Sequence, residues 1–467
     1  MNRVAPLIAL TLAGCVSLDP QYVRPDPAIP ASWPVGDPYL RQSEAILPAL
    51  TYQDIFRDPR LQTLIEQSLA NNSDLQVAAA NIVAAREQYH IQRAQRLPEV
   101  DASTGVNAVG NDNGSGVVAQ YTAGVGIPSF EVDLFGRIGS LTRADLNRYL
   151  ATEAGARATR LTLIGDVAIA WLNYAADRSM LQISEQTAAS AEKSVWLTRA
   201  RLEGGIAPRT DLRQAEQILN QARADLANLR TQVAQDVNLL QLLVGAPIEA
   251  RLLPGSIDEA GTAIGELPAG LSSEVLLRRP DIMQAEYQLL AANAEIGAAR
   301  AALFPRISLT GLLGLASGSL SGLFNGGSFG WGGADDATYP IFRAGAGRAN
   351  VRLTQAQRDA AVASYQKAIQ TAFREVADAL ARRATMNDQV RARQAQKEAA
   401  ADNYMLSEAR YREGIDDFLS SLDAQRSSYF AQQTLVTSKL AAATNLVELY
   451  RALGGDSLYG SSDSNKQ

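Results

Sequence analysis

The chain has 467 residues, a formal net charge of −6 and a pI near 5.2. A nucleic-acid partner would require a basic stripe, and the sequence contains none. With one His and one Cys, the chain cannot assemble a metal site from His and Cys ligands, a His-based catalytic triad or a Cys–His dyad. We therefore expect no nucleic-acid partner, no metal and no catalytic residues.

The first 14 residues have the layout of a bacterial secretion signal. Arg3 is followed by an apolar run from Val4 to Leu12, which is too short to span a bilayer. Leu12-Ala13-Gly14-Cys15 resembles the lipobox of bacterial lipoproteins. This resemblance implies cleavage before Cys15, a covalent lipid on Cys15 as the only added group, and, because Val16 follows instead of Asp, the outer membrane. The alternative is an ordinary signal peptide that leaves a free thiol.

Residues 15–51 form a proline-rich stretch that resists helix formation and predicts an extended, lipid-anchored tether. Trp33 and Tyr39 favour partial packing of this tether against the body over free disorder.

The remainder of the chain is a tandem repeat. At an offset of 209 residues the segments around Gly205-Ile206 and Gly414-Ile415 match, and upstream, at an offset of 207, Pro98 matches Pro305. We assign residues 52–245 and 271–455 to the two repeats, 246–270 to a linker that crosses the helices, and 456–467 to a flexible tail.

Each repeat begins with a helix that precedes two strands. In the first repeat, a break at 71–73 is followed by a capping box of Ser73 and Gln76 that restarts the helix. In the second repeat, the helix starts at Pro280-Asp281. Both helices end at a proline, Pro98 or Pro305.

Beyond each proline the apolar period changes from 3.6 to 2, which predicts four strands, around residues 100–108, 121–127, 307–315 and 329–331. One face of the strands is apolar and the other is small or polar. This pattern fits a membrane β-barrel with a wet lumen and fits equally well a soluble sheet that packs on its own helices. Four strands cannot close a barrel, so the strands imply an oligomer whose copies share their edges.

Two unusually long helices follow the strands, at about 139–203 and 345–413. At 1.5 Å per residue each would reach about 95–100 Å, and their apolar residues follow coiled-coil spacing. Returning helices at about 210–243 and 417–453 end at the C-cap candidates Gly245 and Gly454.

Four features together resemble the outer-membrane factor family of TolC-like channels, in its NodT-like lipoprotein branch. They are the lipobox, the duplicated unit with its strand end at 131–137, the helix start Arg278-Arg279-Pro280-Asp281, and the turn at 411–426. The resemblance implies a mainly α fold with a membrane β-barrel, in which a homotrimer forms an α-helical barrel and shares one twelve-stranded β-barrel. It implies a passive efflux conduit that is anchored in the outer membrane and extends into the periplasm. The partners it implies are a periplasmic adaptor and an inner-membrane transporter of the resistance-nodulation-division class, and it implies no enzyme activity.

The same resemblance places a gate at the periplasmic turn of the second repeat. Leu419 matches the apolar constriction residue of the family, Asp423 its aperture acid and Arg426 a nearby basic position, with Asp416 and Asp417 as weaker candidates. Asp416 and Asp417 also have an ordinary explanation as acids at a helix N-terminus. The chain departs from the TolC pattern at Ser420 and Asp416, so the gate rests more on an Asp423 ring and Leu419 than on a charge network. In the first repeat Asp423 corresponds to Gln214, so we expect the second hairpin to move more. The candidate adaptor contacts are the turn residues Gly205, Ile206, Gly414 and Ile415.

Two other functions remain open. A periplasmic adaptor or coiled-coil scaffolding lipoprotein would share the lipobox and helices but would not need four matched strands. A lipid-anchored enzyme would have to use isolated acids such as Asp101 or Glu131.

Overall fold

The computed structural model describes residues 17–26, 29–30, 51–110, 117–265 and 273–455. The chain divides into two compact units. Unit 1 comprises residues 1–26, 80–154 and 283–367, and unit 2 comprises residues 27–79, 155–282 and 368–467. Each unit takes segments from both halves of the sequence, and the order helix, two strands, long helix, returning helix occurs twice along the chain.

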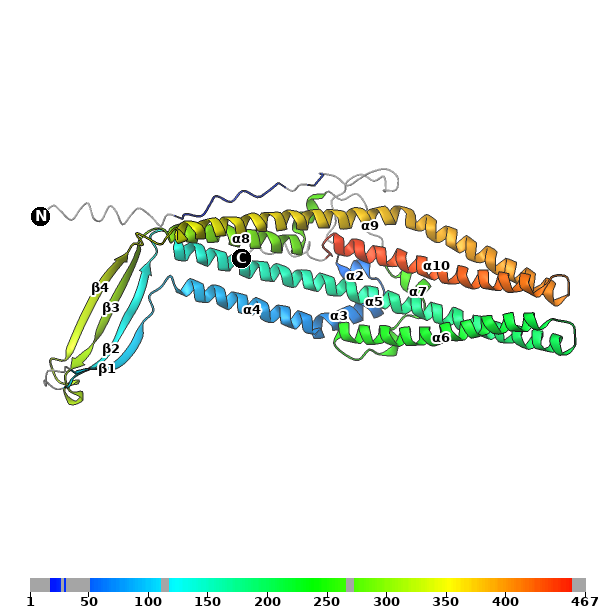
Figure 1. Cartoon of the computed structure of the whole chain (residues 1–467), viewed down its shortest axis with the longest axis horizontal. Helices are drawn as coiled ribbons and strands as arrows, with labels where there is room; N and C mark the ends of the chain where they lie inside the picture. Colours follow the sequence, from blue (N-terminus) through cyan, green and yellow to red (C-terminus); the bar gives the residue numbers. More distant parts are fainter. Residues whose placement is uncertain (1–16, 27–28, 31–50, 111–116, 266–272, 456–467) are drawn as a thin grey trace. The chain divides into compact units, whose positions relative to one another are not determined.

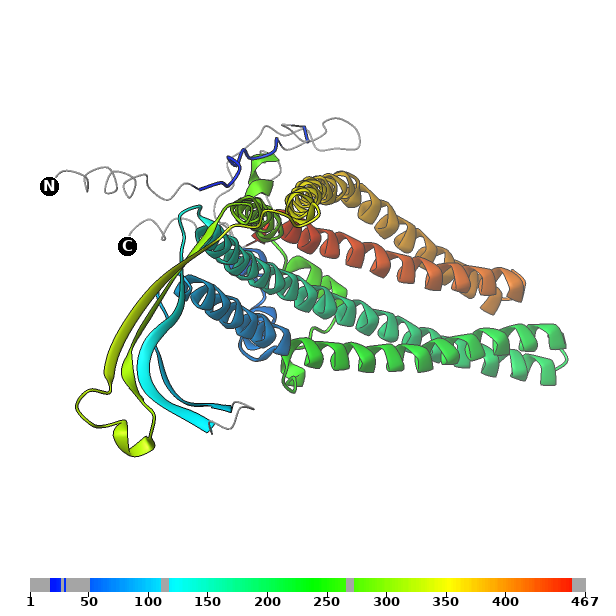
Figure 2. The same cartoon turned by 60° about the vertical axis from the view of Figure 1, so that its left-hand side comes forward.

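Unit 1 contains one antiparallel sheet in the order β1-β2-β3-β4. Its strands are β1 (Asp101–Gly110), β2 (Val117–Val132), β3 (Arg306–Ser317) and β4 (Phe329–Thr338), and Figures 1 and 2 show them side by side as a bowed ribbon. The register pairs Ala108 with Ala119, Val132 with Ile307, and Arg306 with Thr338. The start of β1, the end of β2, the start of β3 and the end of β4 therefore lie at one end of the sheet. All four predicted strands, including the weakest at Phe329 and Trp331, are confirmed.

Strand β2 is longer than the predicted 121–127. It continues past Pro128 to Val132, with a register shift between Ile127 and Phe130. A proline has no N–H for the ladder, and a bulge is one of the places where a strand tolerates it. The bulge therefore explains how the strand continues through a residue that normally ends one.

The sheet has two open edges, β1 and β4, and much of its apolar surface is exposed. Val106 is 64% exposed, Leu313 54% and Trp331 81%. A sheet that packed both its faces within its own chain would not leave these side chains in contact with solvent. The single chain leaves this surface without cover from its described residues.

In the helical region that precedes β1, the structure corrects the predicted cap. The short helix α2 (Tyr52–Ile55) and α3 (Pro59–Asn71) precede α4 (Ser73–Ala94). Asn72, not Ser73, caps α4, because its Oδ1 accepts hydrogen bonds from the backbone N–H groups of Asp74 and Leu75 at 2.9 and 3.2 Å. Asn and Ser are similarly good caps, so the choice between adjacent residues depends on the backbone path.

The long helices match their prediction within two residues. They are α5 (Arg137–Glu203) and α9 (Ala346–Arg412), with 67 residues each. The returning helices are α6 (Arg209–Val244) and α10 (Phe418–Ala452), and α8 (Pro280–Ala301) precedes β3. Gly245 is the C-cap of α6 with φ 72°, as predicted. For α10 the prediction was one residue late, since Leu453 is the C-cap and Gly454, with φ 91°, follows it. None of the helices in the described part of the chain combines the length and apolar character needed to cross a bilayer.

The core of unit 2 lies along the predicted apolar stripes of the long helices. Ile164, Ala168, Trp171 and Ala175 of α5 are almost fully buried. The indole N–H of Trp171 donates to the carbonyl of Leu252 at 3.0 Å. Burial of an aromatic ring with a satisfied N–H fixes the inter-repeat segment against α5.

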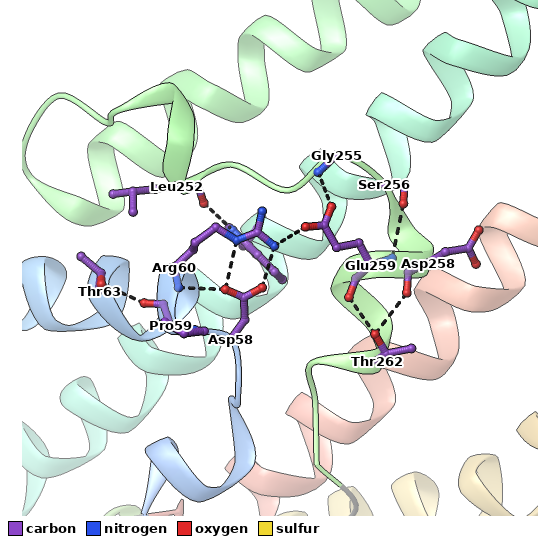
Figure 3. Close-up of polar contacts among 11 residues, drawn as sticks. Asp58, Pro59, Arg60, Thr63, Leu252, Gly255, Ser256, Asp258, Glu259 and Thr262 are labelled. Carbon is purple, nitrogen blue, oxygen red and sulfur yellow. Dashed lines mark hydrogen bonds and ion pairs between the residues drawn. The ribbon is translucent and has the colours of Figure 1, made fainter.

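The inter-repeat segment is ordered over its described part. It contains the 3₁₀ turn η1 (Ala250–Leu252) and helix α7 (Ile257–Thr262). Figure 3 shows the contacts that hold it: Arg60 at the start of α3 forms ion pairs with Asp58 and Glu259, at 2.7 and 2.6 Å. Helix α7 also pairs with α10 through Asp258 and Lys439. The predicted linker thus includes a small helix of its own.

The Arg278-Arg279-Pro280-Asp281 motif begins at the last residue of the 3₁₀ turn η2 (Ser273–Arg278). Arg279 is only 8% exposed; it donates to the Ala452 carbonyl at 2.7 Å and pairs with Asp281 and Glu375. A guanidinium with five donors suits this fork of partners. The motif therefore ties the start of α8 to the end of α10.

Candidate functional site

The two helical hairpins of unit 2 end in turns of the same geometry. Gly205 has φ 71° and Gly414 has φ 75°, a region in which glycine has no steric penalty. The N–H of Ile206 donates to the Arg201 carbonyl at 2.8 Å, and the N–H of Ile415 donates to the Arg410 carbonyl at 2.9 Å. Turn geometry therefore requires both glycines, whatever partner the turns bind.

The isoleucine after each turn glycine points away from the described chain. Ile206 is 79% exposed and Ile415 is 63% exposed. Single exposed apolar residues are common on protein surfaces, so the exposure of these two side chains does not by itself identify a contact site. Their role as adaptor contacts stays a prediction.

The acids at the second turn have separate partners. Asp417 is the N-cap of α10 and accepts hydrogen bonds from the backbone N–H and hydroxyl of Ser420, at 2.9 and 2.6 Å. Asp416 accepts two hydrogen bonds from Arg410, at 2.6 and 2.9 Å. The hydrogen bonds from Ser420 lower the pKa of Asp417, and those from Arg410 lower the pKa of Asp416. Both carboxylates thus stabilise the turn itself.

Asp423, Arg426 and Leu419 lie on the exposed side of α10. Arg426 pairs with Asp423 at 2.9 Å, and both side chains are more than half exposed. Leu419 is 51% exposed. The structure brings Asp423 and Arg426 together, whereas Asp416 and Asp417 bond elsewhere. Whether these residues form a gate stays a prediction.

Beneath the turns, the two hairpins share an apolar cluster. It joins residues of α5, α6, α9 and α10: Ala191, Val195, Leu212, Ala215, Leu219, Tyr411 and Phe418. The rings of Tyr411 and Phe418 lie 5.3 Å apart. Arg201, at the end of α5, lies over the Tyr411 ring at 4.4 Å and donates to the Arg412 carbonyl at 3.1 Å. The Arg201 side chain of the first hairpin therefore satisfies a backbone carbonyl at the C-terminal end of α9 in the second hairpin.

A set of polar contacts links the hairpins further along the helices. The hydroxyl of Tyr429 on α10 contacts the hydroxyl of Ser184 on α5 at 2.8 Å and donates to Asp225 on α6 at 3.0 Å. Ser190 on α5 contacts Tyr404 of α9 at 3.0 Å and Gln425 of α10 at 3.3 Å. Burial, as the largest effect, raises the pKa of Tyr429 to about 12. These phenols remain neutral and hold the hairpins by hydrogen bonds.

Sequence reasoning missed this polar set. Its members are isolated polar residues within alanine-rich stripes, each of which reads as a solvent-facing position. The available signal was two tyrosines, Tyr404 and Tyr429, one on each helix of the second hairpin, because a buried phenol usually finds a hydrogen-bond partner.

The first hairpin carries one further polar feature, a pair of facing carboxyls. Burial, together with the nearby charge of Asp177 on α5, raises the pKa of Asp236 on α6 to about 7. At the equivalent positions of the second repeat, an offset of 209, lie the neutral residues Met386 and Asn445. The carboxyl pair is specific to the first hairpin.

Three predicted regions lie outside the described residues. Cys15 and the signal segment 1–14 are not described, and neither are the tether residues Trp33 and Tyr39 or the tail 456–467. The lipid on Cys15 therefore stays a prediction.

Comparison with known proteins gives matches over most of the chain. The sequence model of the family described as outer membrane efflux protein matches residues 64–246 and 271–455. The solvent efflux pump outer membrane protein SrpC of Pseudomonas putida is 42% identical over 463 residues, with 96% of this chain and 97% of that protein covered. Outer membrane protein OprJ of Pseudomonas aeruginosa is 42% identical over 457 residues, with 97% and 95% covered.

Solved structures show the same fold. The open state of the MtrE outer membrane channel of Neisseria gonorrhoeae has a TM-score of 0.84 and 36% identity, with 94% of this chain and 98% of that chain covered. The structure of CusC has the same TM-score and identity, with 94% and 100% covered.

Proposed function

This chain belongs to the outer membrane efflux protein family, and we propose that three copies form the outer-membrane channel of a tripartite efflux pump. The observation that carries this proposal is the end-to-end similarity to outer-membrane efflux proteins and channels, together with a four-stranded sheet that is open at both edges. In this proposal each copy contributes four strands to a twelve-stranded barrel in the outer membrane, and the long helices enclose a periplasmic duct. Transport is passive, so no residue is assigned to catalysis.

The internal repeat supports the sharing of strands between copies. Within one chain, the rings of Phe135 and Phe304 stack at 4.6 Å beside the β2–β3 pair. At the repeat offset of 207, their equivalents are Phe342 and Leu97, which are 86% and 71% exposed in the single chain. Pairing of β4 with β1 of a neighbouring copy would bring Phe342 of one copy against Leu97 of the next. The contact that Phe135 and Phe304 make beside the middle strands would then recur between Phe342 and Leu97 beside the edge strands.

The register of this pairing follows from the same offset. Phe130 pairs with Leu309 between β2 and β3, and their equivalents on the edge strands are Ala337 and Ala102. We assign these two alanines to facing positions on neighbouring copies. Edge strands that pair in this way form the backbone hydrogen bonds that lipid cannot provide.

The gate of this channel is the ring of second-repeat turns. Threefold symmetry places three Asp423 carboxylates and three Leu419 side chains around the periplasmic aperture, a device that selects cations. The exposure of Leu419, Asp423 and Arg426 on the single chain leaves them free to face a lumen. Arg426 lies beside Asp423 and offsets part of its charge, so the ring has less negative charge than three unpaired acids would have.

The proposal also includes a periplasmic adaptor and a lipid anchor. The exposed Ile206 and Ile415 are the contacts that we assign to a periplasmic adaptor, which connects the duct to an inner-membrane transporter of the resistance-nodulation-division class. A lipid on Cys15 adds an anchor in the outer membrane.

Single-channel recording tests the gate. Purified protein is inserted into planar bilayers, and wild type is compared with Leu419→Ala and Asp423→Ala, with Thr434→Val as a control whose hydroxyl bonds only to its own helix at Phe430. We expect larger openings than wild type in both gate variants and openings of wild-type size in the control. Unchanged conductance in both would remove these residues from the gate.

A further inference from the structure

The described part of the N-terminal segment is seated on unit 1 by an unusually complete set of contacts. We call residues 17–24 the clasp. The Asp19 carboxylate accepts hydrogen bonds from the Ser140 hydroxyl at 2.6 Å and from Arg143 Nε at 2.7 Å. Both donors lie in the first turns of α5. An aspartate held by a hydroxyl and a guanidinium is fixed in position and in orientation.

The backbone on either side of Asp19 is held from α8. Asn293, which is 8% exposed, donates to the Pro20 carbonyl at 2.9 Å, and Arg300 donates to the Leu18 carbonyl at 3.1 Å. Further along, Tyr22 and Arg24 both donate to Glu286. The clasp therefore runs along α8, away from the strand end of that helix.

Gly297 of α8 is the residue that makes room for the clasp. A Cβ at this position would lie 1.7 Å from Asp19 Oδ1 and 2.8 Å from Ser140 Oγ. Those distances are far below contact, so any side chain would displace the carboxylate from both helices. The α8 surface is thus shaped for this chain's own N-terminal segment.

We propose that the clasp fixes the level of the membrane on unit 1, with the inner leaflet of the outer membrane lying against the surface around Ser17 at the strand ends of α5 and α8. This inference rests on the proposed outer-membrane channel with a lipid on Cys15. Cys15 lies four residue positions before Asp19, and an extended chain covers at most about 14 Å in four steps. The lipid must therefore be attached within about that distance of Asp19, which is held by Ser140 and Arg143.

The charges at this level complement a phospholipid surface. Four arginines in the terminal turns or connections next to the sheet are exposed, and their guanidinium groups form no ion pair or hydrogen bond with another described residue: Arg93, Arg96, Arg343 and Arg348. Ile341, in the connection after β4, is 91% exposed. Basic side chains beside an exposed apolar one suit the boundary between headgroups and acyl chains.

Spin labels at two positions on the clasp can report their depth relative to the membrane surface. The only natural cysteine is Cys15, and a lipidated thiol does not react with a spin label, so Ser17→Cys and Val23→Cys each provide one labelling site. Ser17 and Val23 are both exposed. Ser17→Cys removes the hydrogen bonds that Ser17 Oγ accepts from Arg143 and from the Asp19 N–H, and it leaves the side-chain contacts of Asp19 in place. With the full-length protein in vesicles of phosphatidylethanolamine and phosphatidylglycerol, we expect the label at 17 to be shielded from a water-soluble nickel complex. The label at 23, six residues farther from the lipid, should remain accessible to it.

Gly297→Val tests whether the clasp holds this position. We expect both labels to lose their immobilised spectral component, because the valine displaces Asp19. The control is Gly330→Val, since a Cβ at Gly330 meets nothing within 4 Å. Asp19→Ala removes the same hydrogen bonds without adding volume and keeps the test valid if Gly297→Val fails to fold.

Equal nickel access at 17 and 23 in wild type would overturn the membrane assignment, and immobile labels in both Gly297→Val and Asp19→Ala would overturn the clasp. Single-channel recording separates these failures from failure of the proposed function. Normal openings with equal nickel access refute only the membrane level, whereas the absence of openings in wild type refutes the channel on which it rests.

Discussion

The contact between the two hairpins makes a quantitative prediction about the gate. Tyr429→Phe removes one hydroxyl and with it the contacts to Ser184 and Asp225, at 2.8 and 3.0 Å. A neutral hydrogen bond contributes about 1 kcal/mol net, and one to a charged group about 1.5–3 kcal/mol. Because Tyr429 and Asp225 are only partly buried, solvent weakens the bond to the carboxylate, and we take a value below the sum of the two, about 1–2 kcal/mol.

If opening of the duct separates the second hairpin from the first, this energy is lost only from the closed state. A change of about 1–2 kcal/mol then raises the ratio of open to closed channels roughly 5- to 30-fold. Single-channel recording of wild type and Tyr429→Phe measures that ratio directly. Thr434→Val is the matched control on the same helix.

Tyr429→Phe could also act by general destabilisation, so thermal unfolding of each variant is measured alongside. An open-to-closed ratio within two-fold of wild type, in a variant whose unfolding temperature has fallen, would show that the contact stabilises the fold without restraining the gate. That result would refute the reasoning.

Three further predictions follow from other features. The folded-state pKa of Asp236 is raised to about 7, so the unfolding free energy of wild type should fall as pH rises from about 4 through 7. Asp236→Asn should show a weaker dependence on pH in thermal unfolding, and an equally steep loss in this variant would contradict the prediction. Ala102→Cys with Ala337→Cys should give disulfide-linked dimers and trimers on a denaturing gel, whereas Ala108→Cys with Ala337→Cys should not; equal ladders would refute the register. Asn72→Ala should lower the unfolding free energy by about 1 kcal/mol, measured by denaturant unfolding. If Ser73→Ala lowered it by this amount and Asn72→Ala did not, Ser73 would be the cap, as predicted from the sequence.

The helices could be predicted closely because their signals are local. The long helices contain no internal proline, and the apolar stripe through Trp171 continues for many turns. The strands followed from a change of period after Pro98 and Pro305 and from the repeat itself, which doubled the evidence for each element. Asn72 was missed as the cap because two adjacent residues with similar capping ability cannot be ranked without the backbone path. The extension of β2 past Pro128 depends on a bulge, which the residue pattern does not mark.

The site was predicted less completely, for a physical reason. Asp417 as a cap and the turn glycines Gly205 and Gly414 are local features, and the structure shows their geometry directly. The contacts of Tyr429, Ser190 and Arg201 join helices that lie far apart in the sequence. Such contacts depend on which helices are neighbours, and the periodicity of one helix carries no information about its partners.

The central claim, that copies of this chain form a conducting channel in the outer membrane, is tested most directly by single-channel recording of the purified full-length wild-type protein in planar bilayers. The account predicts discrete openings of one unit size, from protein that migrates as a trimer. A protein that never conducts and remains a water-soluble single copy after removal of the lipid would contradict it and would favour the scaffolding alternative.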